Sequence, residues 1–442
     1  MENVMRVMVW NDMTEGQRAQ LLGRGLGEIF SPTLKADIGR IIDDVRNHGD
    51  EAVCRALRDF DRITVEPDRL RVTDDEFDRA RATLDPSVTT AIRYMIDHIR
   101  RFNEQVMLHK AQEWWFESEP GLLVGEKTTP IHSVGLFCPS GKASYPSVLA
   151  QIGTPAVVAG VPARIVITPP IPGSPSGEVD AATLVVADEL GLREVFRVNG
   201  PAGVAAVAFG TQSIPKVVKV VGPGSPAVTC AQIEVQRYGC STMMLLGPTE
   251  SLILADSTAD PVRLAADLLN EAEHGTDSTS VLVTTDRALV AAAQLELARQ
   301  IALLPDQRRE AAAAALGTNG GCVLVDSIEQ GASVANAFGP EHLQLVTSDN
   351  YATLTLIHTA GEVLLGQETT FSMANFVIGC PASLPTSGFA SSASGITAEA
   401  FLKRTAIAHA DNAAMLRTAS SVVALADHEG FPAHANAMKI RL

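Results

Sequence analysis

Two polar pairs in the carboxy-terminal half of the chain combine residue types that bind metals or move protons. Glu271 and His274 end an apolar helical segment three residues apart, so they point to one face, as in half of a zinc site. The same spacing suits a solvated Glu and a His stabilised by the negative helix end. Glu341 and His342 follow a Gly-Pro break, and an imidazole beside a carboxylate suits acid–base catalysis. A connector with two exposed polar residues is the alternative for this second pair.

Two further features lie outside these pairs. Glu429 and His434 stand in an Ala-rich tail that is too small for its own core, so the tail must dock on something. They could complete a site across a subunit boundary, or be surface residues. The segment V-G-P-G-S, residues 221–225, follows a predicted strand and opens a helix, so its backbone N–H groups could approach a pyrophosphate. A plain tight turn explains this segment equally well, and no full phosphate-binding motif occurs at a strand-to-helix turn.

Two series of short β-branched segments, alternating with helix-length apolar segments, must position these residues. The first series comprises residues 132–137, 164–168, 194–198, 217–221 and 242–246. The second comprises residues 252–255, 281–284, 322–325 and 363–365, with helices at 261–274 and 287–303. This alternation predicts right-handed crossovers, parallel sheets and an α/β fold with two doubly wound units.

The two ends of the chain are predicted to be helical. Amphipathic stretches at residues 36–60 and 86–101 carry apolar positions three and four apart, and we extend this prediction over residues 1 to about 130. The tail from about residue 397 is Ala-rich, which predicts helices there as well. Residues 169–177, P-P-I-P-G-S-P-S-G, are predicted to form a surface loop because Pro and Gly continue neither strand nor helix.

Composition excludes several classes of partner. A formal net charge of -16 disfavours nucleic acid, whose binding needs clustered Lys and Arg. The 46% hydrophobic and 19% charged content is that of an ordinary globular protein. Six cysteines lie far apart with no C-x-x-C spacing, so the sequence does not indicate a structural zinc knuckle or a redox pair. No signal-like amino terminus and no run of about 18 apolar residues occurs, so we expect a cytoplasmic protein without a membrane partner.

Motifs along nearly the whole chain resemble histidinol dehydrogenase in order and spacing. They are H-G-D-E-A at His48, V-G-L-F-C-P-S-G (134–141), A-F-G-T (208–211), V-G-P-G (221–224), G-P-T-E-S-L-I-L-A-D (247–256), A-E-H-G (272–275), G-P-E-H-L (339–343), L-P-T-S-G (384–388) and A-H-A-N-A (433–437). The resemblance implies a homodimer with two incomplete Rossmann-like domains that oxidises L-histidinol to L-histidine with NAD and zinc.

The resemblance also implies a division of the chain. Residues 1–30 form a helical arm, and residues 31–136 with 249–396 form a discontinuous Rossmann-like domain that carries the catalytic and metal residues. Residues 137–248 form a second Rossmann-like domain on the cofactor side. Residues 397–442 form a small helical dimerisation tail that docks on the partner subunit and completes its site.

Individual roles follow from the matching positions. The residues implied are Glu271, His274, Asn375 and His434 as metal ligands, with His434 supplied by a second subunit; Glu341 and His342 as catalytic acid–base residues; Thr249 and Glu429 as substrate-binding residues; and Phe137, Ala202 and Ser225 as cofactor-binding residues.

Several of these positions depart from the family. The family has Gln where this chain has Glu271 and Asp where it has Asn375, so the net ligand charge is unchanged. We therefore expect one divalent ion per subunit, zinc by ligand type, although manganese also suits the ligands. Ala382 replaces a substrate-contacting His, and Phe137, Ala202 and Ser225 replace Tyr, Gln and Asn.

These changes predict a metal-dependent, NAD-linked dehydrogenase of a small, polar, amino-alcohol-like substrate that need not be histidinol. The alternative is a diverged metal-binding homologue that has lost NAD and has a non-redox or ligand-binding role.

Overall fold

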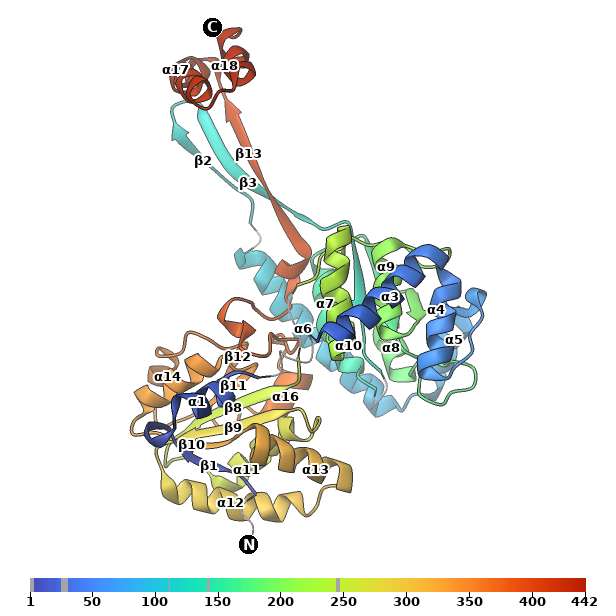
Figure 1. The fold of residues 1–442 in the computed structure, drawn as a ribbon, viewed down its shortest axis with the longest axis vertical. Coiled ribbons are helices and arrows are strands. Elements are labelled where there is room, and N and C mark those ends of the chain that lie inside the picture. Colours follow the sequence, from blue (N-terminus) through green and yellow to red (C-terminus); the bar gives the residue numbers. More distant parts are fainter. Residues whose placement is uncertain (1–3, 25–30, 111, 141–143, 244–246) are drawn as a thin grey trace.

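Three sheets organise the chain, which the computed structural model describes at residues 4–24, 31–110, 112–140, 144–243 and 247–442 (Figure 1). Two sheets are parallel, and the third is antiparallel and extends away from them. The predicted α/β class with parallel sheets is confirmed. The Rossmann-like description of each unit stays a prediction.

A six-stranded parallel sheet forms one half of the molecule, in the order β1-β10-β9-β8-β11-β12. Its strands are β1 (Val7–Val9), β8 (Glu250–Ala255), β9 (Thr279–Thr284), β10 (Gly321–Leu324), β11 (His342–Val346) and β12 (Glu362–Leu365). Side chains alternate along a strand, so Leu252 and Leu254 face one helical layer while Ile253 and Ala255 face the other. The layers contain α1 (Glu15–Leu22), α14 (Ile328–Phe338) and α15 (Asn350–Leu354) on one face, and α11 (Pro261–Ala272), α12 (Arg287–Ile301), α13 (Asp306–Ala314) and α16 (Phe371–Phe376) on the other.

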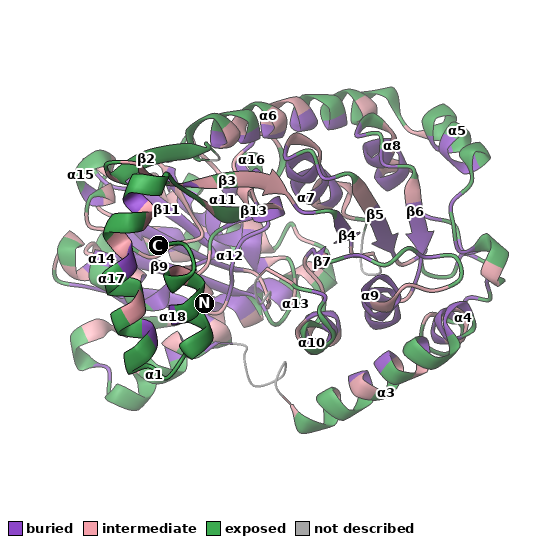
Figure 2. Cartoon of the chain, turned by 90° about the horizontal axis from the view of Figure 1, so that it is seen from above, coloured by how far each residue is buried: buried purple, intermediate pink, exposed green. Residues whose placement is uncertain are grey.

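A four-stranded parallel sheet forms the other half, in the order β6-β5-β4-β7. Its strands are β4 (Ser133–Phe137), β5 (Ala163–Thr168), β6 (Glu194–Arg197) and β7 (Lys219–Val221). Figure 2 shows its two helical layers: α3 (Pro32–His48), α4 (Asp50–Ala56), α9 (Gly200–Phe209) and α10 (Pro226–Val235) on one side, and α5 (Asp74–Thr83), α6 (Pro86–Lys110), α7 (Pro146–Val158) and α8 (Ala181–Glu189) on the other.

The third sheet is an antiparallel arm in the order β13-β3-β2, formed by β2 (Trp114–Glu119), β3 (Leu122–Pro130) and β13 (Leu402–Ala410). It leads to α17 (Asn412–His428) and α18 (Pro432–Lys439), which lie at its far end, away from both parallel sheets (Figure 1). Across the described residues, no helix is both long and apolar enough to span a bilayer.

These contacts correct four predictions from the sequence. The prediction that residues 31–136 belong with residues 249–396 is wrong, because α3 to α6 pack on the four-stranded sheet. The spacing of apolar residues predicts that a helix has a buried face, but it does not predict which sheet that face contacts. Residues 1–30 contribute the edge strand β1 as well as α1, and the tail includes the long strand β13. β2 and β3 lie in the region predicted to be helical. Part of the predicted strand 242–246 lies outside the described residues.

A buried carboxyl on α11 gives a testable pH dependence. Asp267 is 7% exposed and accepts a hydrogen bond from Gln344 Nε2 at 3.0 Å. Burial raises the pKa of Asp267 to about 6, so the folded protein binds this proton more tightly than the unfolded chain does. The stability contributed by the proton is present at low pH and is lost as the pH rises through about 6.

Asp267→Asn is therefore expected to raise the free energy of unfolding by about 1 to 3 kcal/mol at pH 8, with a smaller gain at pH 5 and almost none at pH 4. The oxygen of the new amide can still accept the hydrogen bond from Gln344 Nε2. Urea unfolding at the three pH values measures the effect, with the exposed Asp277→Asn as the control. An equal shift at all three pH values would contradict it.

Candidate active site

The polar side chains of the candidate site gather at the amino ends of neighbouring strands. Glu250, His342 and Glu362 are the first residues of β8, β11 and β12, and the strand register sets His342 beside Ser251 and Glu362. α11 leads back from β8 to the start of β9, so its last turn brings Glu271 to the same edge. Parallel sheets usually bind ligands at their carboxyl ends, so this site lies at the opposite edge.

Glu341 and His342 form a buried acid–base pair. His342 Nδ1 lies 2.5 Å from Glu362 Oε1, and His342 Nε2 lies 3.7 Å from Glu341 Oε1. The backbone N–H of Glu250 donates to Glu341 Oε2 at 3.1 Å. The structure thus brings the two predicted catalytic residues together and fixes each with a neighbour that the sequence did not indicate.

The two groups of the pair have different pKa values. Burial raises the pKa of Glu341 to about 8, against the opposing charge of His342. Burial lowers the pKa of His342, but the charge of Glu341 and the hydrogen bond to Glu362 outweigh it and raise the pKa to about 10. Of the two groups, Glu341 is therefore the one that exchanges a proton near neutral pH, while Glu362 favours the charged form of His342.

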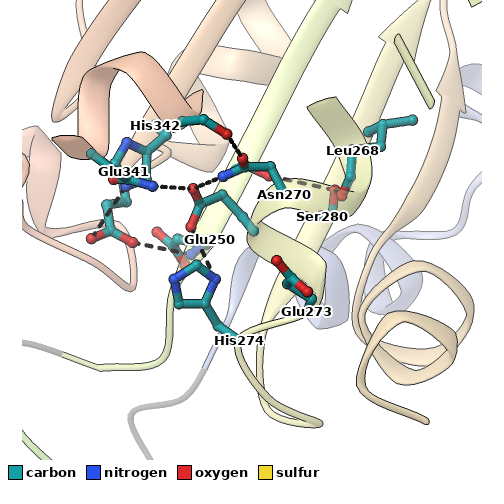
Figure 3. Close-up of polar contacts among 12 residues, drawn as sticks. Glu250, Leu268, Asn270, Glu273, His274, Ser280, Glu341 and His342 are labelled. Carbon is teal, nitrogen blue, oxygen red and sulfur yellow. Dashed lines mark hydrogen bonds and ion pairs between the residues drawn. The ribbon is translucent and has the colours of Figure 1, made fainter. Parts of the chain in front are cut away.

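Three of the four predicted metal ligands lie together at the end of α11. Glu271 is buried, and its Oε1 accepts a hydrogen bond from Asn375 Nδ2 on α16 at 2.8 Å. Its Oε2 lies 3.5 Å from His274 Nδ1, whose side chain is 42% exposed. Figure 3 shows His274 and Asn270 at the end of α11, near Glu341 and His342. Glu271 thus lies in the last turn of α11, as predicted, whereas the helix ends at Ala272 and His274 follows it by two residues.

Comparisons with known proteins identify the family of the chain. The family model for histidinol dehydrogenase matches residues 28–442. The chain belongs to the histidinol dehydrogenase family. It is 38% identical to a histidinol dehydrogenase homolog of Colwellia psychrerythraea, covering 99% of this chain and 97% of that protein, and 36% identical to histidinol dehydrogenase of Synechocystis, covering 99% of both. The crystal structure of histidinol dehydrogenase from Elizabethkingia anophelis matches with a TM-score of 0.92 and 28% identity, covering 100% of this chain and 98% of the other. Family membership makes the protein an oxidoreductase of the alcohol or aldehyde class.

The ligand types of the three clustered residues fit the zinc that the histidinol dehydrogenase family uses. A buried carboxylate, an amide and an imidazole supply oxygen and nitrogen donors, and the acidic neighbourhood of Glu341 and Glu271 favours a cation. Within the described ranges, no three His, Cys, Asp or Glu side chains are arranged to hold a metal ion by themselves. The predicted ligands are not a cluster of this kind, because one of them is the amide of Asn375 and another, His434, lies on the tail.

The tail residues predicted for the histidinol dehydrogenase site lie elsewhere in the single chain. His434 is on α18 and Glu429 ends α17, so both sit on the arm, away from Glu271 and His274 (Figure 1). Thr249 precedes Glu250, is half-buried and accepts a hydrogen bond from the Thr279 N–H at 3.0 Å. The single chain therefore contains Thr249 but neither tail residue at the site.

The predicted cofactor positions surround the end of β4 and the start of α10. Phe137 is 2% exposed and Ala202 is fully covered, so neither side chain is available to a ligand. Ser225 is exposed at the start of α10, after the turn that contains Gly222. Gly222 has φ of +133°, and a Cβ there would lie 2.0 Å from the Phe137 carbonyl oxygen. Only the turn and Ser225 therefore fit a bound pyrophosphate.

Sequence reasoning missed three charged residues of this histidinol dehydrogenase fold. Arg24 donates from Nε to Glu250 Oε2 at 2.6 Å and from Nη2 to Glu250 Oε1 at 2.9 Å. Glu362 holds His342, as described above. The sequence carries no local signal for these residues. Glu362 only precedes the predicted strand 363–365, and the partner of Arg24 is 226 residues away.

Proposed function

We propose that the protein is a zinc-dependent, NAD-linked dehydrogenase that oxidises the hydroxyl of a small, polar, amino-alcohol-like substrate. Family membership supports the reaction class. The observation that carries the proposal is the meeting of Glu271, Asn375 and the Glu341–His342 pair at one edge of the six-stranded sheet.

In the proposed reaction, Glu271, His274 and Asn375 would hold the zinc ion. When bound, zinc would polarise the substrate oxygen and NAD would accept the hydride. The sequence prediction gave the hydroxyl proton to His342 and water activation to Glu341. The geometry supports a shared role: Glu341 takes up the proton near neutral pH, and His342, fixed by Glu362, orients and relays it.

We further propose a homodimer in which the tail of one subunit docks on the other and brings His434 and Glu429 to its site. The arm is the support for this proposal. Large apolar side chains about half exposed lie along it: Trp114, Trp115, Phe116, Leu425 and Phe431. An apolar surface of this kind is typical of a protein interface.

The alternative function, a metal-binding homologue without NAD, is favoured by one observation. Phe137 and Ala202, two of the three predicted cofactor residues, are covered by the protein. A cofactor would then depend on the glycine turn and Ser225 alone.

A combined binding and activity assay tests the proposal. We expect about one zinc ion per chain in the purified protein, saturable binding of NAD, and NAD reduction with at least one member of a panel of amino alcohols that begins with histidinol. His434→Ala is expected to lower activity without changing the oligomeric state. Absence of binding to NAD and NADP at millimolar concentration would favour the alternative.

A further inference from the structure

The Glu271 carboxylate is held by a hydrogen-bond network that reaches beyond the predicted ligands. Glu271 is 1% exposed, and its Oε1 accepts hydrogen bonds from Asn270 Nδ2 at 2.7 Å and from Asn375 Nδ2 at 2.8 Å. The hydroxyl of Ser372 donates to Asn270 Oδ1. Figure 3 shows Asn270 within this network.

The network joins two helices that are far apart in the sequence. Asn270 and Glu271 belong to the last turn of α11, while Ser372 and Asn375 are three residues apart on α16 and share one face of it. Ser372 therefore fixes Asn270 from the same helix that supplies Asn375. The end of α11 is bound to α16 at both residues.

The direction of these hydrogen bonds orients the ligand atoms. Two amide donors occupy Oε1 of Glu271, whereas Oε2 lies 3.5 Å from His274 Nδ1, longer than an ordinary N–H···O hydrogen bond. Oε2 is therefore the oxygen turned toward His274. Because Asn375 gives its Nδ2 to Glu271, its Oδ1 is the atom left for a cation.

We infer that Asn270 and Ser372 are positioning residues that hold the Glu271 carboxylate, and through it the Asn375 amide, in the orientation needed to bind a divalent cation. The inference rests on the proposed function, because it takes Glu271, His274 and Asn375 as ligands. A carboxylate free to rotate would present either oxygen, and Asn375 could then turn its Nδ2 toward the cation. Partners of metal ligands typically contribute about 10- to 100-fold to metal affinity.

Zinc affinity of the full-length protein, measured by competition with a chromophoric chelator, tests this inference without any substrate. We expect Asn270→Ala to weaken zinc binding by about 10- to 100-fold and Ser372→Ala to weaken it less. Because Ser372 acts through Asn270, the double variant should bind zinc no more weakly than Asn270→Ala alone. Ser372 is exposed, so its loss leaves the core intact.

Matched controls separate positioning from general damage. Ser333→Ala removes an exposed hydroxyl that donates to the Glu329 carbonyl on α14, and should leave zinc affinity unchanged. Glu271→Ala removes a ligand and should abolish tight binding. If Glu271→Ala loses zinc while Asn270→Ala and Ser372→Ala bind it as the parent does, the positioning role is overturned and the proposed function stands. If the parent protein binds no zinc, both are overturned.

Discussion

Replacing His342 by Asn is expected to lower turnover by about 100- to 10,000-fold, the range associated with loss of an acid–base group. His342 is 2% exposed and lies between Glu362 and Glu341, so its two ring nitrogens connect the two carboxylates. Asparagine keeps a donor for Glu362 but cannot carry a proton between them. Steady-state turnover with the best amino alcohol from the panel, followed as NAD reduction, measures the loss.

The variant must remain folded for this result to concern catalysis. Circular dichroism and zinc content should match the parent protein, because His342 is not among the proposed ligands. His358→Asn, a histidine of the same half of the molecule that lies outside the site, should keep parental turnover. Parental turnover in His342→Asn would remove His342 from the mechanism.

The local patterns of the sequence predicted most of the two parallel sheets. β-branched runs mark β4, β5, β8 and β9 within a few residues, because buried parallel strands need continuous apolar segments. The strand β11 was missed because its buried sequence H-L-Q-L-V begins with the catalytic His342 and includes Gln344, which bonds to Asp267. His342 and Gln344 thus place polar residues in a buried strand, where the prediction expected only apolar ones.

The arm and the pairing of helices with sheets were beyond local patterns. β2 is exposed along nearly its whole length in the single chain, so it shows no alternation of apolar and polar residues. β2 pairs with its neighbour β3, but β3 pairs with β13 through contacts nearly 300 residues apart in the sequence. The amphipathic helices α3 and α6 show a buried face but not the sheet on which that face rests.

Local sequence patterns identified some residues of the candidate site but not others. Helical spacing identified Glu271 with His274, and adjacency identified Glu341 with His342. Asn375 came only from the resemblance, because a lone Asn on a short helix carries no signal of its own. Glu250 and Glu362 become site residues only through strand register, which pairs His342 with Glu362 and with Ser251, the residue after Glu250.

Arg24→Met is expected to lower the free energy of unfolding by about 3 to 5 kcal/mol, because it leaves Glu250 as a buried charge without its cation. The Arg24 and Glu250 side chains are 6% and 2% exposed. Arg24 also donates to the Phe338 carbonyl at 2.7 Å, and its guanidinium lies 3.4 Å from the centre of the Phe338 ring. The segment after α1 is thereby attached to the start of β8.

The double variant Arg24→Met/Glu250→Gln separates loss of the pair from loss of packing. With both charges removed, no unpaired ion remains, so the double variant should be more stable than Arg24→Met alone, and the two single effects should not add. Arg299→Met, which breaks the exposed pair with Glu296, should cost less than about 1 kcal/mol. Urea unfolding is measured for the parent protein, both single variants Arg24→Met and Glu250→Gln, the double variant and Arg299→Met. Additive single effects would contradict a coupled buried pair. Since the backbone N–H of Glu250 also holds Glu341, a loss of turnover in the refolded double variant would show that this ion pair supports the acid–base residue as well as the fold.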